Sequence, residues 1–221
     1  MKADSATPVI RVLVVDDHPV VREGLAMQID TQSDMLICGE AENVPAALAL
    51  LDSAKPDVAI VDISLKSDNG IDLIRRINFR NQGVRVLVLS MYPESLFGER
   101  ALLAGAHGYI SKGEATGRLL EGIRTVIAGE VYFSAELTER IASGSVGAGD
   151  FESSPMERLS VRELQAFELM GQGMNTESIA ARMHVSPKTV ETYRARIKEK
   201  LGLKNVTELV QRATQWLFES K

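Results

Sequence analysis

Residues 12–25 read VLVVDDHPVVREGL, and this stretch decides the fold class of the first part of the chain. Its aliphatic residues run without a polar break, which is typical of a strand buried on both faces of a parallel sheet. Two adjacent aspartates end the run, and an amphipathic segment follows them. Similar aliphatic runs recur along the first 130 residues. The predicted strands are Ile10–Val15, Met35–Gly39, Val58–Val61, Val84–Leu89 and Gly108–Ile110.

Segments with helical spacing separate these strands. Apolar residues lie three and four apart in Val20–Ile29, Val44–Leu51, Gly70–Ile77, Leu96–Leu103 and Leu119–Ile127. Strands that alternate with helices form a parallel sheet with helices on both faces. We therefore predict an α/β domain with a five-stranded parallel sheet over residues 9–130.

Composition limits the size and the location of the protein. The chain has 221 residues, 45% of them hydrophobic, enough for a packed core in one large or two small domains. The longest apolar runs, of about five residues, are too short to cross a membrane. The N-terminal residues lack the apolar core of a secretory signal, and the single cysteine, Cys38, fits a reducing compartment. We expect a cytoplasmic protein with no membrane partner.

The second part of the chain begins after a change in composition. Residues 143–155 hold eight Ser, Gly or Pro among thirteen positions, which is typical of a mobile linker. We place the linker at 131–155, with a short helix at 135–142 leading into it. Residues 156–221 have helical spacing and predict a small all-α domain of four helices. The predicted helix starts are Ser160, Asn175, Ser186 and Asn205.

Polar residues follow four of the predicted strands. Asp16 and Asp17 follow the first, Asp62 the third, Ser90 the fourth and Lys112 the fifth. Ligands bind at the carboxyl ends of the strands in such sheets, so we expect these side chains to lie together. Three close carboxylates need a cation, and oxygen ligands suit Mg²⁺. The hydroxyl and the ammonium would then hold a phosphoryl group on one carboxylate.

Residues 10–128 resemble the receiver domain of two-component response regulators, which has a CheY-like, flavodoxin-like fold. The matching stretches are VLVVDDHPVVREGL, PDVAIVDISLKSDNGIDLI, VRVLVLSMY and GAHGYISK. The resemblance implies that Asp62 is the phosphoacceptor. It also implies that Mg²⁺ is held by Asp16, Asp17, Asp62 and the backbone carbonyl of Ser64.

The same resemblance assigns three further roles. Ser90 is the switch hydroxyl, Lys112 the phosphate-binding lysine and Tyr109 the aromatic rotamer switch. A half-buried strand aromatic is the alternative interpretation of Tyr109. The phosphoryl group comes from a partner histidine kinase in this family.

Residues 176–199 read TESIAARMH, VSPK and TVETYRARIKE, a helix, a turn and a second helix. On the second helix an apolar stripe runs through Val190, Tyr193, Ile197 and Leu201. Small and polar residues occupy the opposite face and basic residues its edges, which suits the major groove of DNA. A solvent-exposed amphipathic helix is the alternative. The region 156–221 carries 5 Lys and 6 Arg against 8 Glu, a net charge of +3, whereas the other 155 residues carry −8. This asymmetry favours a nucleic-acid partner for the second domain.

The stretch LSVRELQAFELMGQGMNTESIAARMHVSPKTVETYRARIKEKLGL resembles the LuxR-type domain of the NarL/FixJ subfamily. The resemblance implies base contacts from Glu191, Thr192 and Ala195. Phosphate contacts are implied for positions such as Lys188 and Arg194, and Tyr193 replaces a common His. The full DNA-binding set is Lys188, Thr189, Glu191, Thr192, Tyr193, Arg194, Ala195, Arg196 and Lys198.

Together the two resemblances predict a transcriptional response regulator that is not an enzyme. Phosphorylation of Asp62 alters dimerisation and exposes the second domain, so that a homodimer binds double-stranded promoter DNA. An aspartyl-phosphate phosphatase is one alternative, but such enzymes commonly carry a second Asp where this chain has Ser64. A protein-interaction module that no longer takes phosphate is another, and the intact Asp, Ser and Lys set argues against it.

Overall fold

The computed structural model describes residues 9–65, 69–80, 83–143 and 155–219. The chain divides into two compact units, within residues 1–148 and 149–221. Each unit has its own core and is described by itself. Among the described residues, no helix is both long and apolar enough to span a membrane.

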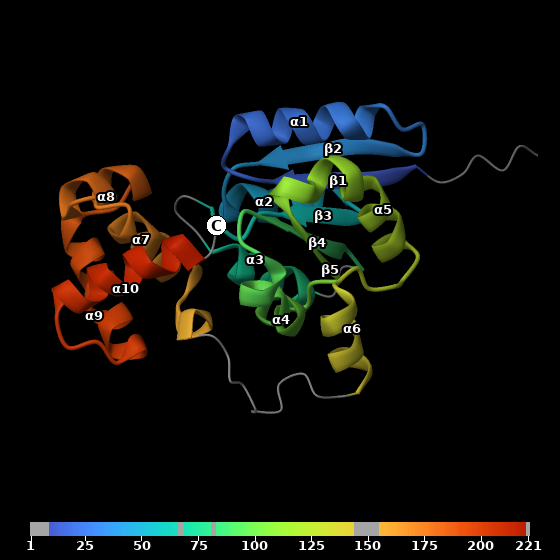
Figure 1. The fold of residues 1–221 in the computed structure, drawn as a ribbon. Helices are drawn as coiled ribbons and strands as arrows, with labels where there is room; N and C mark the ends of the chain where they lie inside the picture. The colour runs from blue at the N-terminus through green and yellow to red at the C-terminus, as the bar shows by residue number, and fades with distance from the viewer. Residues whose placement is uncertain (1–8, 66–68, 81–82, 144–154, 220–221) are drawn as a thin grey trace, which may run out of the picture. The chain divides into compact units, whose positions relative to one another are not determined.

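The first unit contains a five-stranded sheet in the order β2-β1-β3-β4-β5, with every pair parallel (Figure 1). The strands are β1 Ile10–Val15, β2 Met35–Ala41, β3 Val58–Val61, β4 Arg85–Ser90 and β5 Gly108–Ser111. The predicted fold class and sheet are therefore confirmed. Strand β2 lies on one side of β1 and strand β3 on the other, so the strand order reverses its direction at β1. Such a reversal places a binding crevice at the carboxyl ends of β1 and β3.

Helices cover both faces of this sheet. Their bounds are α1 Pro19–Asp30, α2 Val44–Ala54, α3 Gly70–Phe79, α4 Glu94–Ala104 and α5 Ala115–Ile127. Helices α1 and α5 lie on one face, and α2, α3 and α4 on the other (Figure 1). The core under α1 and α5 is aliphatic, with Val12, Ile29, Ile60 and Ile123 almost fully buried. Each such side chain contributes about 1.5–3 kcal/mol to folding, which makes the sheet a rigid base for the polar groups at its edge.

Helix α6, Ala135–Ala142, packs against α4 in the same unit. The Ser134 backbone N–H donates to the Glu94 carboxylate at 3.0 and 3.1 Å, and Arg140 pairs with Glu99 at 2.6 Å. The short helix predicted at 135–142 is confirmed. Residues 144–154 of the predicted linker lie outside the described residues, so the domain boundaries stay a prediction.

The second unit is helical throughout its described part. Its elements are the short 3₁₀ helix η2 Pro155–Arg158, α7 Val161–Gly171, α8 Thr176–Met183, α9 Pro187–Leu201 and α10 Val206–Glu219. The four predicted caps are confirmed, since each side-chain oxygen accepts a hydrogen bond from a first-turn backbone N–H. Phe167 and Trp216 pack in the core with ring centroids 6.0 Å apart.

Candidate functional site

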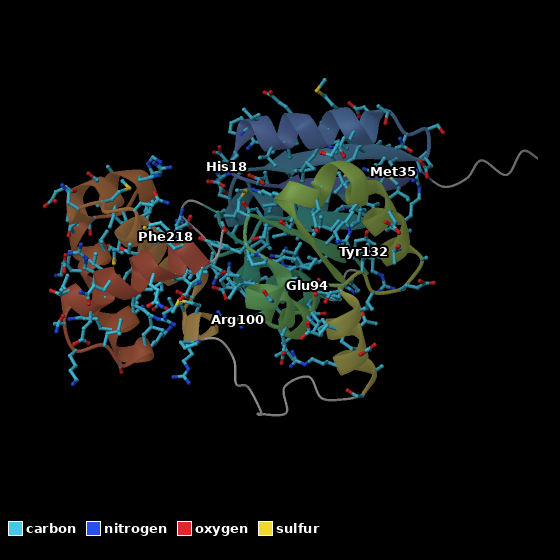
Figure 2. All side chains as sticks on the ribbon, in the orientation of Figure 1. His18, Met35, Glu94, Arg100, Tyr132 and Phe218 are labelled. Carbon is cyan, nitrogen blue, oxygen red and sulfur yellow. The ribbon has the colours of Figure 1, made fainter. Side chains whose placement is uncertain are left out.

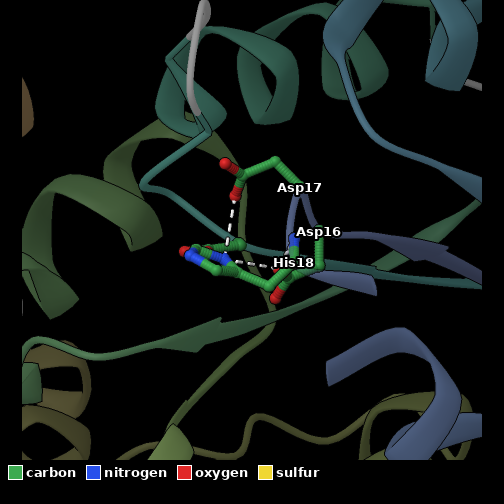
Figure 3. Close-up of side chains that lie close together, drawn as sticks. Asp16, Asp17 and His18 are labelled. Carbon is green, nitrogen blue, oxygen red and sulfur yellow. Dashed lines mark hydrogen bonds and ion pairs between the residues drawn. The ribbon is translucent and has the colours of Figure 1, made fainter. Parts of the chain in front are cut away.

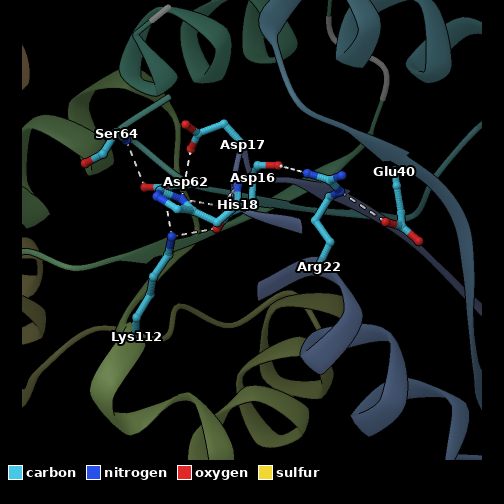
Figure 4. Close-up of polar contacts among 8 residues, drawn as sticks. All are labelled: Asp16, Asp17, His18, Arg22, Glu40, Asp62, Ser64 and Lys112. Atoms are coloured by element: carbon cyan, nitrogen blue, oxygen red, sulfur yellow. Dashed lines mark hydrogen bonds and ion pairs between the residues drawn. The ribbon is translucent and has the colours of Figure 1, made fainter. Parts of the chain in front are cut away.

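Three carboxyl groups meet at the carboxyl ends of β1 and β3. Asp16, Asp17 and Asp62 are 1%, 5% and 1% exposed. One ligand atom from each of them, together with one from His18, lies within 4.8 Å of the others (Figure 4). Burial of several like charges is unfavourable unless positive charge compensates them. The geometry therefore defines a strongly anionic pocket.

Lys112, which follows β5, reaches into this pocket. Its Nζ lies 2.6 Å from Asp16 Oδ2 and 2.7 Å from Asp62 Oδ2 (Figure 4). Burial opposes the charge on Lys112, but the carboxylates of Asp62 and Asp16 outweigh it and raise the pKa of the lysine. Burial also raises the pKa of Asp62; Lys112 opposes this and Asp16 adds to it. The ammonium thus compensates only part of the negative charge.

Backbone groups fix the position of Asp62. The Ser64 N–H donates to Asp62 Oδ1 at 2.8 Å. Gly70, at the start of α3, lies against the backbone of Asp62 and Ile63, where a Cβ atom would clash. The backbone at position 70 can approach Asp62 and Ile63 this closely only if residue 70 is glycine.

The backbone of Asp16 is held from α1. Arg22 donates from Nη1 to the Asp16 carbonyl at 2.7 Å and from Nε to Glu40 at 3.2 Å (Figure 4). The Asp16 side chain accepts from the His18 N–H at 2.8 Å. These contacts set Asp16 before any ligand arrives, which limits the reorganisation that binding requires.

The donor set of the pocket fits a divalent cation. With histidine counted as neutral, the three ionised acids and Lys112 carry a formal charge of −2 within the described residues. Carboxylate oxygens are the ligands that Mg²⁺ prefers in proteins. The pocket can therefore bind Mg²⁺ or a similar ion.

Ser90 is the last residue of β4, and Tyr109 lies within the neighbouring strand β5. Ser90 is fully buried, and its Oγ accepts from the Tyr92 N–H at 3.1 Å. The Tyr109 hydroxyl donates to the Tyr92 carbonyl at 2.9 Å. Tyr109 is 2% exposed, so it is fully buried and not half-buried. Burial raises the pKa of its phenol, which stays a hydrogen-bond donor. Both side chains thus bond the same residue, Tyr92.

Sequence reasoning missed two residues of this site, His18 and Arg22. His18 lies at the N-terminal end of α1 (Figure 2), and its imidazole faces Asp16 and Asp17. Its position directly after two aspartates that were predicted to bind a metal was a usable signal. Arg22 was not predictable, because its partners are the backbone carbonyl of Asp16 and Glu40 of strand β2.

Helix α9 presents a polar face in the second unit. Its exposed residues include Lys188, Glu191, Thr192, Ala195 and Arg196. The remaining predicted contact residues, Thr189, Tyr193, Arg194 and Lys198, are partly buried at its edges. Glu191 Oε1 accepts from Arg194 at 3.0 Å and from the Thr176 hydroxyl at 2.9 Å. This pairing partly neutralises Glu191 on a face that also carries Lys188, Arg196 and a second acid, Glu199.

Two families of domains match this chain. "Response regulator receiver domain" matches residues 12–124, and "Bacterial regulatory proteins, luxR family" matches residues 157–213. The fold and the site thus define a receiver followed by a LuxR-type DNA-binding region. The chain belongs to the family of two-component response regulators with a LuxR-type domain. The family prediction is confirmed.

Similar proteins agree with this assignment. The response regulator GacA of Pseudomonas aeruginosa is 34% identical over 200 residues, covering 90% of this chain and 93% of GacA. A LuxR-family response regulator from Aurantimonas sp. SI85-9A1 is 31% identical with a TM-score of 0.56, covering 62% of this chain and 99% of that one. RcsB of Salmonella enterica serovar Typhimurium, bound to promoter P1flhDC with BeF3-, is 26% identical with a TM-score of 0.58, covering 93% and 98%.

The family determines the general function. This chain is a DNA-binding transcriptional response regulator that is controlled by phosphorylation, and its receiver implies a histidine kinase as partner. The family consists of transcription regulators and not of enzymes, which confirms that prediction.

Proposed function

We propose that Asp62 is the phosphoacceptor and that Lys112 holds the transferred group. The 2.7 Å contact between Lys112 Nζ and Asp62 Oδ2, inside a pocket of three buried acids, carries this proposal. A carboxylate oxygen of Asp62 forms a bond to phosphorus while the bond from phosphorus to the histidine nitrogen of the kinase breaks. Lys112 then turns from the carboxylates to the phosphoryl oxygens, whose negative charge its ammonium offsets.

The carboxylates of Asp16, Asp17 and Asp62 and the carbonyl of Ser64 would hold the Mg²⁺ ion. The formal charge of −2 in the pocket supports this ligand set. Bound Mg²⁺ supplies positive charge that offsets the acids and the phosphoryl oxygens. Arg22 holds the backbone of Asp16 in place through its hydrogen bond to the Asp16 carbonyl.

Ser90 and Tyr109 form the switch. Ser90 donates its hydroxyl hydrogen to a phosphoryl oxygen, and Tyr109 turns into the space beside it. The support is that both residues now bond Tyr92, whose ring packs against Phe97 of α4 with centroids 5.4 Å apart. A shift of Ser90 therefore moves the loop that leads into α4, because closely packed groups have few alternative arrangements.

The output is binding of a homodimer to double-stranded promoter DNA in the cytoplasm. The receiver spans residues 9–130, the linker 131–155 and the DNA-binding domain 156–221. RcsB, which was solved on a promoter, supports this use of the same fold. Two chains related by a twofold axis match two half-sites of DNA. On α9, Lys188, Arg194, Arg196 and Lys198 contact phosphates, with Thr189 and Tyr193 beside them.

Glu191, Thr192 and Ala195 face the bases. These three side chains are exposed on α9, and a carboxylate can accept a hydrogen bond from the amino group of cytosine. Arg194 donates to Glu191 Oε1 at 3.0 Å and so offsets part of the charge that Glu191 would bring near the phosphates.

The test joins phosphorylation to DNA binding. Full-length protein is incubated with acetyl phosphate and Mg²⁺, run on a Phos-tag gel, and titrated with promoter fragments enriched from genomic DNA. We expect a shifted band and tighter DNA binding, both of which are lost in Asp62→Asn. Asp72→Asn is the matched control, because Asp72 lies on the outer side of α3 and pairs with Arg75. Equal DNA affinity with and without phosphodonor would refute phosphoryl control.

A further inference from the structure

His18 has a backbone that directs its side chain toward the acidic pocket. It precedes Pro19, the first residue of α1, and has φ −98° and ψ 110°. A residue before proline is confined to this extended region. The imidazole therefore stays outside the helix and lies beside the two aspartates (Figure 3).

Two distances in this group match the spacing of adjacent ligand atoms around a metal ion. His18 Nδ1 lies 3.1 Å from Asp16 Oδ1 and 3.0 Å from Asp17 Oδ1. In an octahedral site with bonds of about 2.1 Å, adjacent ligand atoms are about 3.0 Å apart and opposite ones about 4.2 Å. The four candidate ligand atoms, Asp62 included, all lie within 4.8 Å of one another.

We propose that His18 is a nitrogen ligand of the divalent cation and makes this pocket prefer Mn²⁺ and Co²⁺ to Mg²⁺. The inference rests on the metal site of the proposed function and adds the identity of the ion. Imidazole nitrogen binds transition metals well, whereas Mg²⁺ favours oxygen ligands and keeps its water. One nitrogen beside three carboxylates shifts the preference toward transition metals without closing the site to Mg²⁺.

The exposure of the ligands fits this arrangement. The His18 side chain is 56% exposed, while those of Asp16 and Asp17 are 2% and 4% exposed. The imidazole thus stands at the mouth of the pocket, where an ion and its remaining water can enter. The alternative is that Nδ1–H only donates hydrogen bonds to the two carboxylates, and this alternative predicts no metal selectivity.

The first measurement is a pair of titrations. Full-length wild type, His18→Phe and His184→Asn are titrated with MnCl₂ and with MgCl₂ by isothermal calorimetry. Phenylalanine keeps an aromatic ring without a ligand atom. His184 lies in the second unit at a left-handed backbone position with φ 54°, which asparagine tolerates, and serves as the control. Loss of a residue that only supports a metal ligand typically weakens metal binding by about 10–100-fold. We therefore expect the Mn²⁺ affinity of His18→Phe to fall by at least about tenfold, with Mg²⁺ affinity nearly unchanged.

The second measurement reports the bond between the metal and the imidazole nitrogen directly. Electron spin echo envelope modulation spectroscopy of Mn²⁺ bound to the wild type shows a coupling to a nitrogen nucleus if an imidazole is a ligand. We expect the coupling in wild type and His184→Asn and its absence in His18→Phe. Bound Mn²⁺ without nitrogen coupling, or equal losses for both ions, would overturn the role of His18 alone. Wild type that binds neither ion would overturn the proposed metal site itself, and His18 with it.

Discussion

Asp62 and Glu163 are both buried carboxyl groups that pair with a lysine, one in each unit. Asp62 is 1% exposed and lies 2.7 Å from Lys112 Nζ, and Glu163 is 3% exposed and lies 2.6 Å from Lys200 Nζ. Their pKa values nevertheless move in opposite directions. Burial raises the pKa of Asp62 in spite of its lysine.

The surroundings of Glu163 explain the difference. Burial would raise its pKa, but hydrogen bonds from Lys200 and from the Ser160 backbone outweigh burial and lower it. The same carboxylate completes a capping box at the start of α7. Asp62 instead shares its lysine with Asp16, which adds like charge.

Glu163 is thus a structural acid, whereas Asp62 has the surroundings expected of an acid in a ligand site. The chain itself compensates Glu163, which needs nothing further. The Asp62 pocket keeps negative charge that a cation must compensate, and such a deficit is typical of a ligand site. Removal of Lys112 should therefore change the response to phosphorylation, whereas removal of Lys200 should not.

The largest effect is expected for Lys112→Ala. Coupling between a phosphorylation site and an output site typically changes affinity by about 5–150-fold, and we expect this gain in promoter affinity to vanish. Without the ammonium, the phosphoryl oxygens lack the charge that draws them toward the switch. Fluorescence anisotropy with a labelled promoter, with and without acetyl phosphate, measures the gain. Lys200→Ala should keep it, and an undiminished gain in Lys112→Ala would contradict the assigned role.

Glu163→Ala should destabilise the second unit by about 2 kcal/mol, because it removes half of a capping box and a buried ion pair. Trp216 is the single tryptophan of the chain and packs on Phe167, so its fluorescence reports urea unfolding of this unit in the full-length protein. Glu199→Ala, an exposed change on α9, is the control. An unchanged urea midpoint for Glu163→Ala would mean that the Glu163–Lys200 pair contributes nothing to the stability of the second unit.

The sequence predicted most of the fold and of the candidate site, because both depend on local sequence pattern and on sheet topology. Strand ends and parallel order bring Asp16, Asp17, Asp62 and Lys112 to one edge wherever the intervening loops run. Helix caps are equally local, since a cap bonds residues two or three positions away. The charge balance at Glu163 was not predictable, because Lys200 is 37 positions away on another helix.

Two other features required coordinates. Helix α6 docks on α4 through Glu94 and Glu99, and charged residues on a helix surface do not indicate which partner they meet. Tyr109 admitted two interpretations, a rotamer switch and a half-buried strand aromatic, because both place the same residue type in the same strand. Its role depends on Tyr92, which periodicity alone does not connect to it.

Asp17→Asn should stabilise the first unit when no divalent ion is present. Two charges about 4 Å apart interact by about 4 kcal/mol at an effective dielectric constant of 20. Loss of the contact with His18 offsets part of this relief. We expect a net gain of about 1 kcal/mol, or roughly 2–4 °C in Tm. Circular dichroism melts in EDTA measure it, and the rise in Tm on adding MgCl₂ should shrink. A lower Tm in EDTA would show that His18 fully compensates Asp17.

The pH dependence of the second unit should follow Glu163 and is the smallest effect. Its pKa is lower in the folded than in the unfolded chain, so folding favours the ionised form. The stabilisation is fully present above the unfolded value of about 4.3 and is lost as pH falls through the lower folded value. Urea unfolding followed by Trp216 fluorescence at several values between pH 6 and pH 3 measures this loss of stability. The loss should begin as the pH falls below about 4.3. Glu163→Gln cannot titrate there, so its stability should change less with pH. If the stability of the wild type and of Glu163→Gln changed in parallel with pH, other carboxyl groups would determine the pH dependence. The lowered pKa of Glu163 would then contribute no measurable stability to set against Asp62.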